Sequence, residues 1–209
     1  MTLGELAQYI NGSKHLGVHL TVVAMQQWSR DEYFDQTGLP WVNPSPNLRS
    51  VTAATLYPGL GMLDLVNVSV GRGTSNPFEQ FGAAWMKAPD VAAALTARQI
   101  PGVTFSATTT TVADDSNHYP FHGQTIDAVR IALTDRNALD SPELGIEILS
   151  VLHRLYPAQF QLERSLRLIG SRDTLDAITR GDDPRSIAAS WNSALAAFRA
   201  ARAPYLLYR

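Results

Sequence analysis

The chain has 209 residues, of which 45% are hydrophobic, enough to bury a core as one large domain. Its net charge of -2, without any run of lysine or arginine, argues against a nucleic-acid partner. Cysteine is absent, so disulfides, thiolate nucleophiles and cysteine-ligated metals are excluded. No apolar run reaches the length of a membrane span, and no signal peptide is recognisable.

Helices and strands are expected to alternate along the first half of the chain. Thr2 and Glu5 have capping-box spacing, which predicts a helix that ends at Gly12. The β-branched residues of 18–25 predict a buried strand, and 26–47 is expected to be a long loop. Three further elements are expected: a helix over 48–56 stopped by Pro58 and Gly59, a strand over 63–70, and a helix over 89–99.

The second half contains the clearest patterns. Two strands are predicted, at 103–112 and 126–133. A strong helix is predicted to start at Ser141, because proline occupies its first positions and glutamate its first turn. Helices over 171–179 and 184–202 follow, and the last residues are expected to dock as an edge strand or a packed terminus. The sequence therefore predicts a mixed α/β (α+β) fold: one domain, residues 1–209, with a mixed sheet flanked by helices.

The segment 67–85 is predicted to be a ligand-binding loop. Gly71 and Gly73 flank Arg72, so the backbone can adopt positive φ on either side and present the guanidinium group from a tight turn. Arg72 is therefore the first candidate binding residue. The structural alternative is that Arg72 caps a helix or forms an ion pair with Glu79.

A second polar loop surrounds two prolines. Asn43, Ser45 and Asn47 offer donors and acceptors beside an aromatic residue, a combination that suits a sugar. Ser45 and Asn47 could equally cap the helix that follows. Tyr57 is a candidate for stacking or hydrogen bonding to the same ligand, although a half-buried structural tyrosine is the commoner outcome.

The histidines do not indicate a metal site. His118 and His122 are four residues apart, but the proline between them argues against the helix that a zinc-binding pair of this spacing requires. We interpret His122 as a polar contact in a loop. No phosphate-binding loop or nucleophile elbow is present, and the sequence predicts neither a metal nor another cofactor.

Several ordered motifs together carry a family resemblance. These are MTLGELA, TGLPWVNPSPN, LYPG, NVSVGRGT followed by PFEQFGAAW, IPGV and TDRNALDSPELG. The chain resembles the NamZ-type exo-β-N-acetylmuramidases along nearly its whole length. The resemblance implies removal of terminal N-acetylmuramic acid from peptidoglycan fragments, and a periplasmic or secreted location in bacteria.

The resemblance also implies that only the C-terminal domain of the family is present. Members are about twice as long, with an N-terminal Rossmann-like domain that carries the best catalytic glutamate, so the missing domain would be a partner of this chain. The sequence therefore predicts the substrate-binding half of a glycosidase, inactive alone. The alternatives are a non-catalytic module that binds muropeptides or sugars, and a decayed fragment. A homodimer through the exposed cleft face is also open.

The candidate site residues follow from the loops and the resemblance. Asp64 and Glu79 are the catalytic candidates, and the alternative for both is structural pairing with Arg72 or Arg136. The family usually has glutamate where Asp64 stands, so the shorter side chain weakens its candidacy. The substrate-binding candidates are Asn43, Ser45, Asn47, Tyr57, Asn67, Ser69, Arg72, Thr74 and His122.

Overall fold

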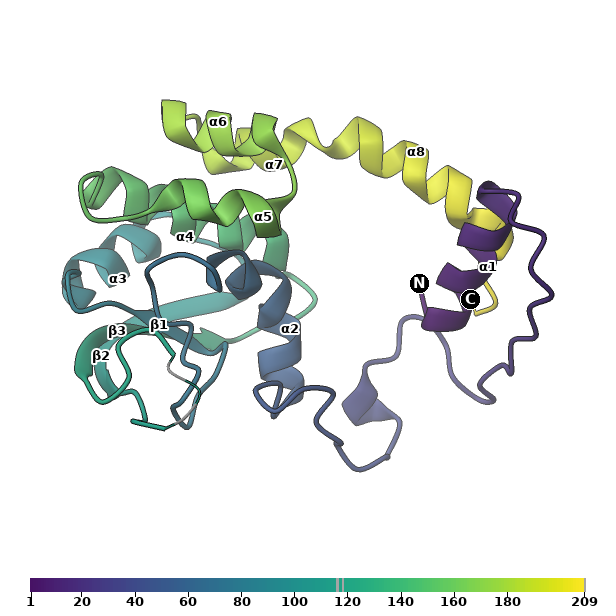
Figure 1. Cartoon of the computed structure of the whole chain (residues 1–209), viewed down its shortest axis with the longest axis horizontal. Coiled ribbons are helices and arrows are strands. Elements are labelled where there is room, and N and C mark those ends of the chain that lie inside the picture. Colours follow the sequence, from purple (N-terminus) through teal and green to yellow (C-terminus); the bar gives the residue numbers. More distant parts are fainter. Residues whose placement is uncertain (116, 118, 209) are drawn as a thin grey trace. The chain divides into compact units, whose positions relative to one another are not determined.

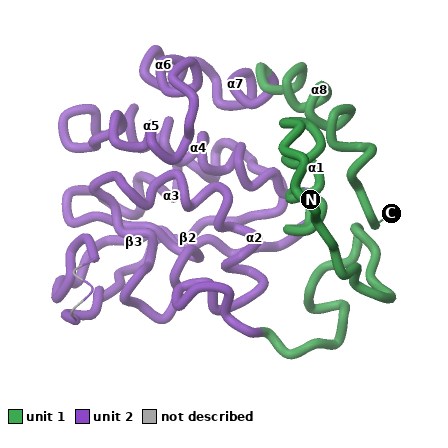
Figure 2. Tube along the Cα trace, turned by 45° about the vertical axis from the view of Figure 1, so that its right-hand side comes forward, with its two compact units in different colours: residues 1–41, 190–209 green, residues 42–189 purple. Residues whose placement is uncertain are grey.

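The computed structural model describes residues 1–115, 117 and 119–208, which form two compact units. Unit 1 combines the two ends of the chain, residues 1–41 and 190–209, and unit 2 is residues 42–189 (Figure 2). The sequence predicts one domain, whereas the contacts between residues separate these two bodies. We describe each unit by itself.

Unit 2 contains a three-stranded sheet in the order β1-β3-β2. The strands are β1 (Gln80–Gly82), β2 (Val103–Thr111) and β3 (Thr125–Leu133). The mixed α/β class and the two longer strands are confirmed. The predicted mixed sheet is antiparallel in the described residues, because β3 pairs antiparallel with both neighbours. β1 was not predicted, since three residues are too few to show an alternating pattern.

Helices of unit 2 cover one face of this sheet (Figure 1). Helix α3 packs on β2 and β3, and α4 packs on α2, α3 and α6. Leu144, Ile148 and Leu149 of α4 are fully buried. This core supports the loops described below. The helix bounds are α2 (Val51–Leu60), α3 (Ala88–Ala97), α4 (Ser141–Leu155), α5 (Leu166–Ile169), α6 (Arg172–Arg180) and α7 (Pro184–Ser190).

Helix α2 continues through the proline that was predicted to stop it. Pro58 lacks an N–H and cannot donate within the helix. Ser141, at the start of α4, compensates: its Oγ accepts a hydrogen bond from the Gly59 N–H at 3.0 Å and donates to the Leu56 carbonyl at 3.1 Å. A side chain 82 residues away thus binds two backbone groups next to the proline, and the helix continues past the residue that was expected to end it.

The strand predicted at 63–70 is wrong. Only Ser69 forms a bridge, with Gly82, and the segment before it consists of turns. Val66, Val68 and Val70 are nevertheless buried. The hydrophobic pattern therefore reports burial correctly, but burial does not require a strand when turns bring the side chains into the core.

Unit 1 is built around α1 (Leu3–Ser13) and α8 (Asn192–Arg202). The predicted capping box of Thr2 and Glu5 is confirmed. The predicted strand over 18–25 is wrong, since these residues have no regular structure and Val23 is 91% exposed. Asn11 explains part of this, because its side chain binds both the N–H and the carbonyl of Val18, where a strand would need a neighbouring backbone.

The C-terminal region also differs from the predicted single helix. The chain turns at Trp191, which separates α7 from α8. Of the two expectations for the tail, the packed terminus is confirmed, because Tyr205 packs edge-to-face against Tyr9 with ring centroids 5.5 Å apart.

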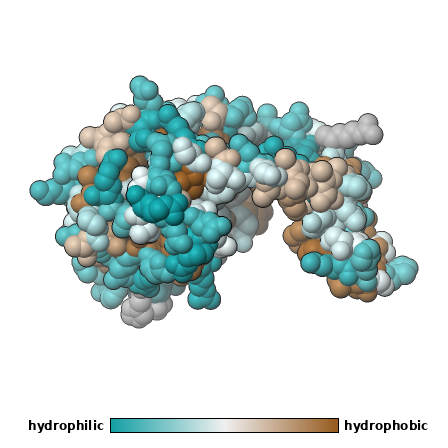
Figure 3. Space-filling model, turned by 90° about the horizontal axis from the view of Figure 1, so that it is seen from above, coloured by the Kyte–Doolittle hydropathy of each residue, from teal (hydrophilic) through white to brown (hydrophobic). Residues whose placement is uncertain are grey.

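No described helix is long and apolar enough to cross a membrane. Figure 3 shows hydrophilic residues over much of the visible face, with smaller hydrophobic patches.

Candidate functional site

The predicted loop around Arg72 is ordered by its glycines. Gly71 has φ 80° and Gly73 has φ 76°, as the sequence predicted. A Cβ atom on Gly71 would lie 2.5 Å from the carbonyl oxygen of Asn76, so both conformation and space require glycine. Thr74 Oγ1 donates to the Gly71 carbonyl at 2.7 Å and accepts the Asn76 N–H at 3.1 Å. Thr74 therefore stabilises the turn.

Arg72 forms a two-pronged ion pair with Asp64. Its Nε lies 2.8 Å from Asp64 Oδ1, and its Nη2 binds Oδ2. The guanidinium carbon lies 5.0 Å from the centre of the Phe78 ring and 5.9 Å from that of Tyr119. Burial opposes the charge, but hydrogen bonding and attraction to Asp64 raise the pKa of Arg72 above its ordinary value. Arg72 is therefore paired with Asp64, a pairing expected for Asp64, and not with Glu79.

Aromatic side chains surround this ion pair. Phe78 is buried, and the Tyr57 ring meets it edge-to-face at 4.9 Å. Asn47 is also buried, and its Nδ2 donates to the Tyr119 hydroxyl at 3.2 Å. Asn47, Tyr57, Asp64 and Arg72 are therefore linked in one region through Phe78 and Tyr119. Tyr119 was missed, because it lies beyond a turn-rich segment with no periodic pattern.

Glu79 is held by two other residues. Its Oε1 accepts the Ser50 hydroxyl at 2.9 Å, and its Oε2 lies 2.8 Å from Arg130 Nη2. Glu79 therefore forms an ion pair, but its partner is Arg130 and not Arg72 or Arg136, the partners that the sequence had suggested. Both candidate catalytic carboxylates thus have an arginine partner on the described structure.

Two other predicted binding residues have structural partners. Asn67 Nδ2 donates to the Gln159 carbonyl at 2.8 Å, and its Oδ1 accepts the Gln161 N–H at 2.9 Å. Ser69 is buried, exchanges two backbone hydrogen bonds with Gly82, and accepts the Gly71 N–H through its hydroxyl. These contacts fix the approach to the Arg72 loop.

The remaining candidates lie near the surface. Asn43 is exposed, and the Ser45 carbonyl accepts the Leu48 N–H in a turn. His122 Nδ1 lies 3.1 Å from Asp114 Oδ1, consistent with the predicted polar loop contact. His118 lies outside the described residues. Across the described part of the chain, no three histidine, aspartate or glutamate side chains gather closely enough to hold a metal ion.

A polar groove of about 470 Å³ lies on the sheet beside these loops. The strand register places Gln80, Arg130 and Ser106 side by side across the three strands. Gln80 Nε2 donates to Thr74 Oγ1 and Thr110 Oγ1, both at 3.0 Å. Neither Arg130 nor the threonines of β2 were predicted as site residues. Their signal was an arginine within an otherwise apolar strand and a threonine run on the neighbouring strand. The groove residues are Thr74, Ser75, Asn76, Gln80, Ser106, Ala107, Thr108, Thr109, Thr110, Thr111 and Arg130.

Two family models match the chain. Residues 55–208 match the model described as "Exo-beta-N-acetylmuramidase NamZ, C-terminal", and residues 1–52 match its N-terminal counterpart. The expectation that the chain holds only the C-terminal domain is therefore wrong, since its first part matches the N-terminal model. The sequence reasoning missed this because it assigned the opening motif and the TGLPWVNPSPN stretch to the C-terminal domain.

Relatives of known sequence or structure agree with these models. The chain is 34% identical to "Peptidoglycan beta-N-acetylmuramidase NamZ" of Bacillus subtilis over its whole length, which is 50% of that protein. A DUF1343 family protein of Bacteroides fragilis matches with a TM-score of 0.86 and 26% identity, over 99% of this chain and 56% of that one. A second, at 24% identity and a TM-score of 0.76, shares the fold. The chain spans about half the length of these relatives, and it belongs to the NamZ exo-β-N-acetylmuramidase family.

Proposed function

We propose that this chain binds the sugar in an exo-β-N-acetylmuramidase that releases terminal N-acetylmuramic acid from peptidoglycan fragments. Family membership supports the muramidase-related activity. The observation that carries the proposed division of labour is that Asp64 and Glu79 are held by arginines beside a polar groove. A periplasmic or secreted location in bacteria goes with this proposal.

The ion pairs argue against acid–base catalysis by these two carboxylates. Glycosidases use one carboxyl group as a proton donor and a second as a base or nucleophile. Both oxygens of Asp64 accept from Arg72, while those of Glu79 accept from Ser50 and Arg130. For either group to act on a sugar, it would have to give up a charged hydrogen bond to its arginine partner. These ion pairs therefore favour substrate binding, rather than catalysis, as the role of this chain.

Arg130 is the better-placed anchor for the acidic sugar. N-acetylmuramic acid carries a lactyl carboxylate, and a guanidinium group matches a carboxylate with two parallel donors. Arg130 lines the groove and gives one nitrogen, Nη2, to Glu79, whereas two of the three guanidinium nitrogens of Arg72 face Asp64. The hydroxyls of Thr108, Thr110 and their neighbours would then bind the sugar hydroxyl and acetamido groups.

The Arg130→Lys variant is expected to weaken N-acetylmuramic acid binding by about 1 to 3 kcal/mol, the contribution of a hydrogen bond to a charged group. Lysine retains the charge but loses the fork of donors. Calorimetry on the folded variants measures this loss. Arg72→Lys is the matched control and should retain most of the affinity. The reverse result would return the anchor to Arg72, the residue that the sequence predicted.

The purified chain is expected to bind N-acetylmuramic acid without cleaving its glycosides at an enzymatic rate. The reason is that both candidate carboxylates have arginine partners. A chromogenic N-acetylmuramic acid glycoside measures the release. Turnover at roughly 1 per second or faster would contradict inactivity of the chain alone. Cleavage that disappears in Asp64→Asn or Glu79→Gln, with the fold retained, would restore that residue as catalytic.

A further inference from the structure

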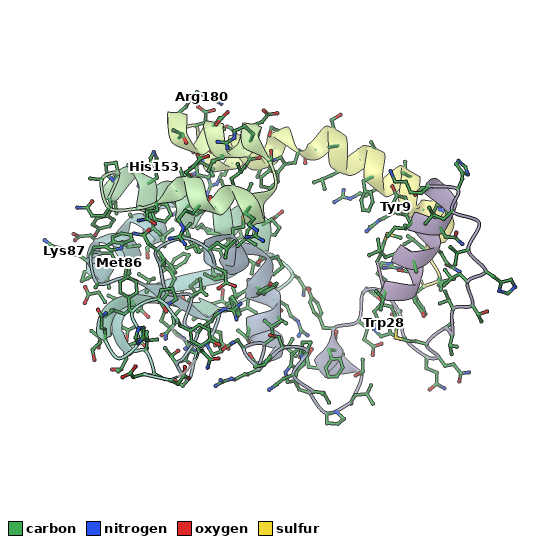
Figure 4. The ribbon with its side chains drawn as sticks, viewed as in Figure 1. Tyr9, Trp28, Met86, Lys87, His153 and Arg180 are labelled. Atoms are coloured by element: carbon green, nitrogen blue, oxygen red, sulfur yellow. The ribbon has the colours of Figure 1, made fainter. Side chains whose placement is uncertain are left out.

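A second pocket lies within unit 1, on the long loop that follows α1. It is a hollow of about 550 Å³ that is widely open to solvent. Trp28 forms part of its wall and is half-buried (Figure 4). We call it the loop pocket. Its lining residues are Gln27, Trp28, Ser29, Asp31, Glu32 and Gln36.

The loop that carries this pocket is fixed although it contains little regular structure. Glu5 of α1 is fully buried, and its Oε1 binds Arg30 Nη2 and accepts the Leu207 N–H at 2.8 Å. The Tyr208 hydroxyl accepts the Met25 N–H at 2.9 Å. The loop is thereby connected to α1 and to the C-terminal tail. A binding site gains affinity when its residues are held in place before the ligand arrives.

Trp28 is itself positioned by this network. Its ring meets the Tyr208 ring at 75° with a centroid separation of 5.0 Å, so the two faces are not stacked on each other. A tryptophan ring combines a large apolar face with low conformational freedom. Such a ring suits a flat ligand whose own face is made of C–H groups and whose edges are polar, as in a pyranose sugar.

The charges of the loop pocket select against acidic ligands. Asp31 and Glu32 contribute carboxylates, and the described residues that line the pocket include no lysine or arginine. The Ser29 hydroxyl donates to Asp31 Oδ1 at 2.5 Å, and this bond lowers the pKa of Asp31 below its ordinary value. Gln27 and Gln36 add amide groups that can both donate and accept.

We infer that the loop pocket binds the neutral N-acetylhexosamine unit of a peptidoglycan fragment, with Trp28 against the ring face and the carboxylates accepting from its hydroxyls. The substrate class rests on the proposed function. N-acetylglucosamine lacks the lactyl carboxylate of N-acetylmuramic acid, so the acidic pocket and the Arg130 groove would each select a different sugar. The groove contains the cationic Arg130, which suits the acidic sugar, and the loop pocket contains Asp31 and Glu32, which suit the neutral one.

The test measures binding of two probes by calorimetry or ligand-observed NMR: N,N'-diacetylchitobiose and N-acetylmuramic acid. The Arg130→Lys variant serves as the background, so that the groove contributes little. We expect the neutral disaccharide to bind about tenfold or more tightly than the acidic sugar. Trp28→Ala should weaken disaccharide binding about tenfold, and Trp28→Phe should retain most of it.

A charge series makes the test specific to the loop pocket. The Asp31→Asn, Glu32→Gln double variant should reduce the preference for the neutral probe, because like-charge repulsion is removed. Asp35→Asn is the matched control on the same loop, since Asp35 does not line the pocket, and it should leave the preference unchanged. Equal binding by Trp28→Ala, or no disaccharide binding at all, would overturn the inference. So would a preference for free L-lysine, which would assign the carboxylates to an ammonium group. None of these readouts depends on cleavage, so they can fail while the muramidase proposal stands.

Discussion

Replacing Gly59 by alanine is expected to destabilise unit 2 by about 3 kcal/mol or more, at the upper end of the cost of overpacking. A Cβ atom at this position would lie 2.2 Å from the carbonyl oxygen of Ser141 and 3.0 Å from the Gly145 nitrogen. Gly145 faces it in the same way, since its own Cβ would lie 2.7 Å from the Gly59 carbonyl. Backbone lies against backbone here, so no side-chain rotation can relieve the clash. The same insertion would separate Ser141 from the interrupted turn of α2.

Urea denaturation of the variants measures this cost, with hydrogen exchange on α2 and α4 as the local readout. Gly61→Ala is the matched control two residues along the chain. Its φ is -59°, and a Cβ there would approach no atom closer than 3.5 Å, so alanine should be neutral or slightly stabilising. If Gly59→Ala and Gly61→Ala unfolded at the same denaturant concentration, α2 and α4 would not be in backbone contact.

Acidification is expected to loosen unit 1 through Glu5. Burial disfavours its charge, but hydrogen bonds from the Thr2 and Leu207 backbones and from Arg30 lower its pKa from 4.5 to about 2. A lowered pKa stabilises the fold fully above pH 4.5, and this stabilisation is lost as the pH falls towards 2. The difference corresponds to about 3 kcal/mol. Glu5→Gln should lose a similar amount at neutral pH, because Arg30 is left without its buried partner.

Hydrogen exchange of the α1 amides between pH 2 and 6, corrected for intrinsic exchange rates, follows this loss. The parent chain should show rising α1 exchange below pH 4.5, and Glu5→Gln should show a flatter profile. Glu163→Gln is the control, because Glu163 pairs with Arg172 on the surface of unit 2 and such pairs contribute little. A steep pH dependence in Glu5→Gln equal to that of the parent would assign the acid sensitivity to another group.

The sequence predicted the elements that carry local end signals. The α1 capping box and the proline and glutamate at the start of α4 are signals within one turn, and both helices form where expected. Pro58 is also a strong local signal, yet α2 continues past it, where Ser141 binds the Gly59 N–H and the Leu56 carbonyl on either side of the proline. The local signal thus failed where a distant side chain binds the backbone of the helix.

In the candidate site too, local features were predictable and contacts between distant residues were not. The positive φ values at Gly71 and Gly73 were predicted from residue type alone, because only the local backbone decides them. The Arg72–Asp64 pair, eight residues apart, was among the expected pairings, but the partner of Glu79 was not expected: it is Arg130, which is 51 residues away. The sequence shows which residues are charged but not which of them meet. The strand register, which places Arg130 beside Gln80 and Ser106, is a property of the folded sheet.

Unit 1 joins the two ends of the chain, and this affects the order in which the protein can fold during synthesis. Glu5 binds the backbone of Leu207, 202 residues later, so the first helix is made long before its partners exist. At the usual speed of translation, the segment between residues 41 and 190 takes roughly 7 to 30 seconds to synthesise. During that interval the aromatic and apolar residues of α1, such as Tyr9, have neither Phe198 nor Tyr205 to pack against. The interval is long enough for chaperones to bind them, and unit 2 can complete its fold first.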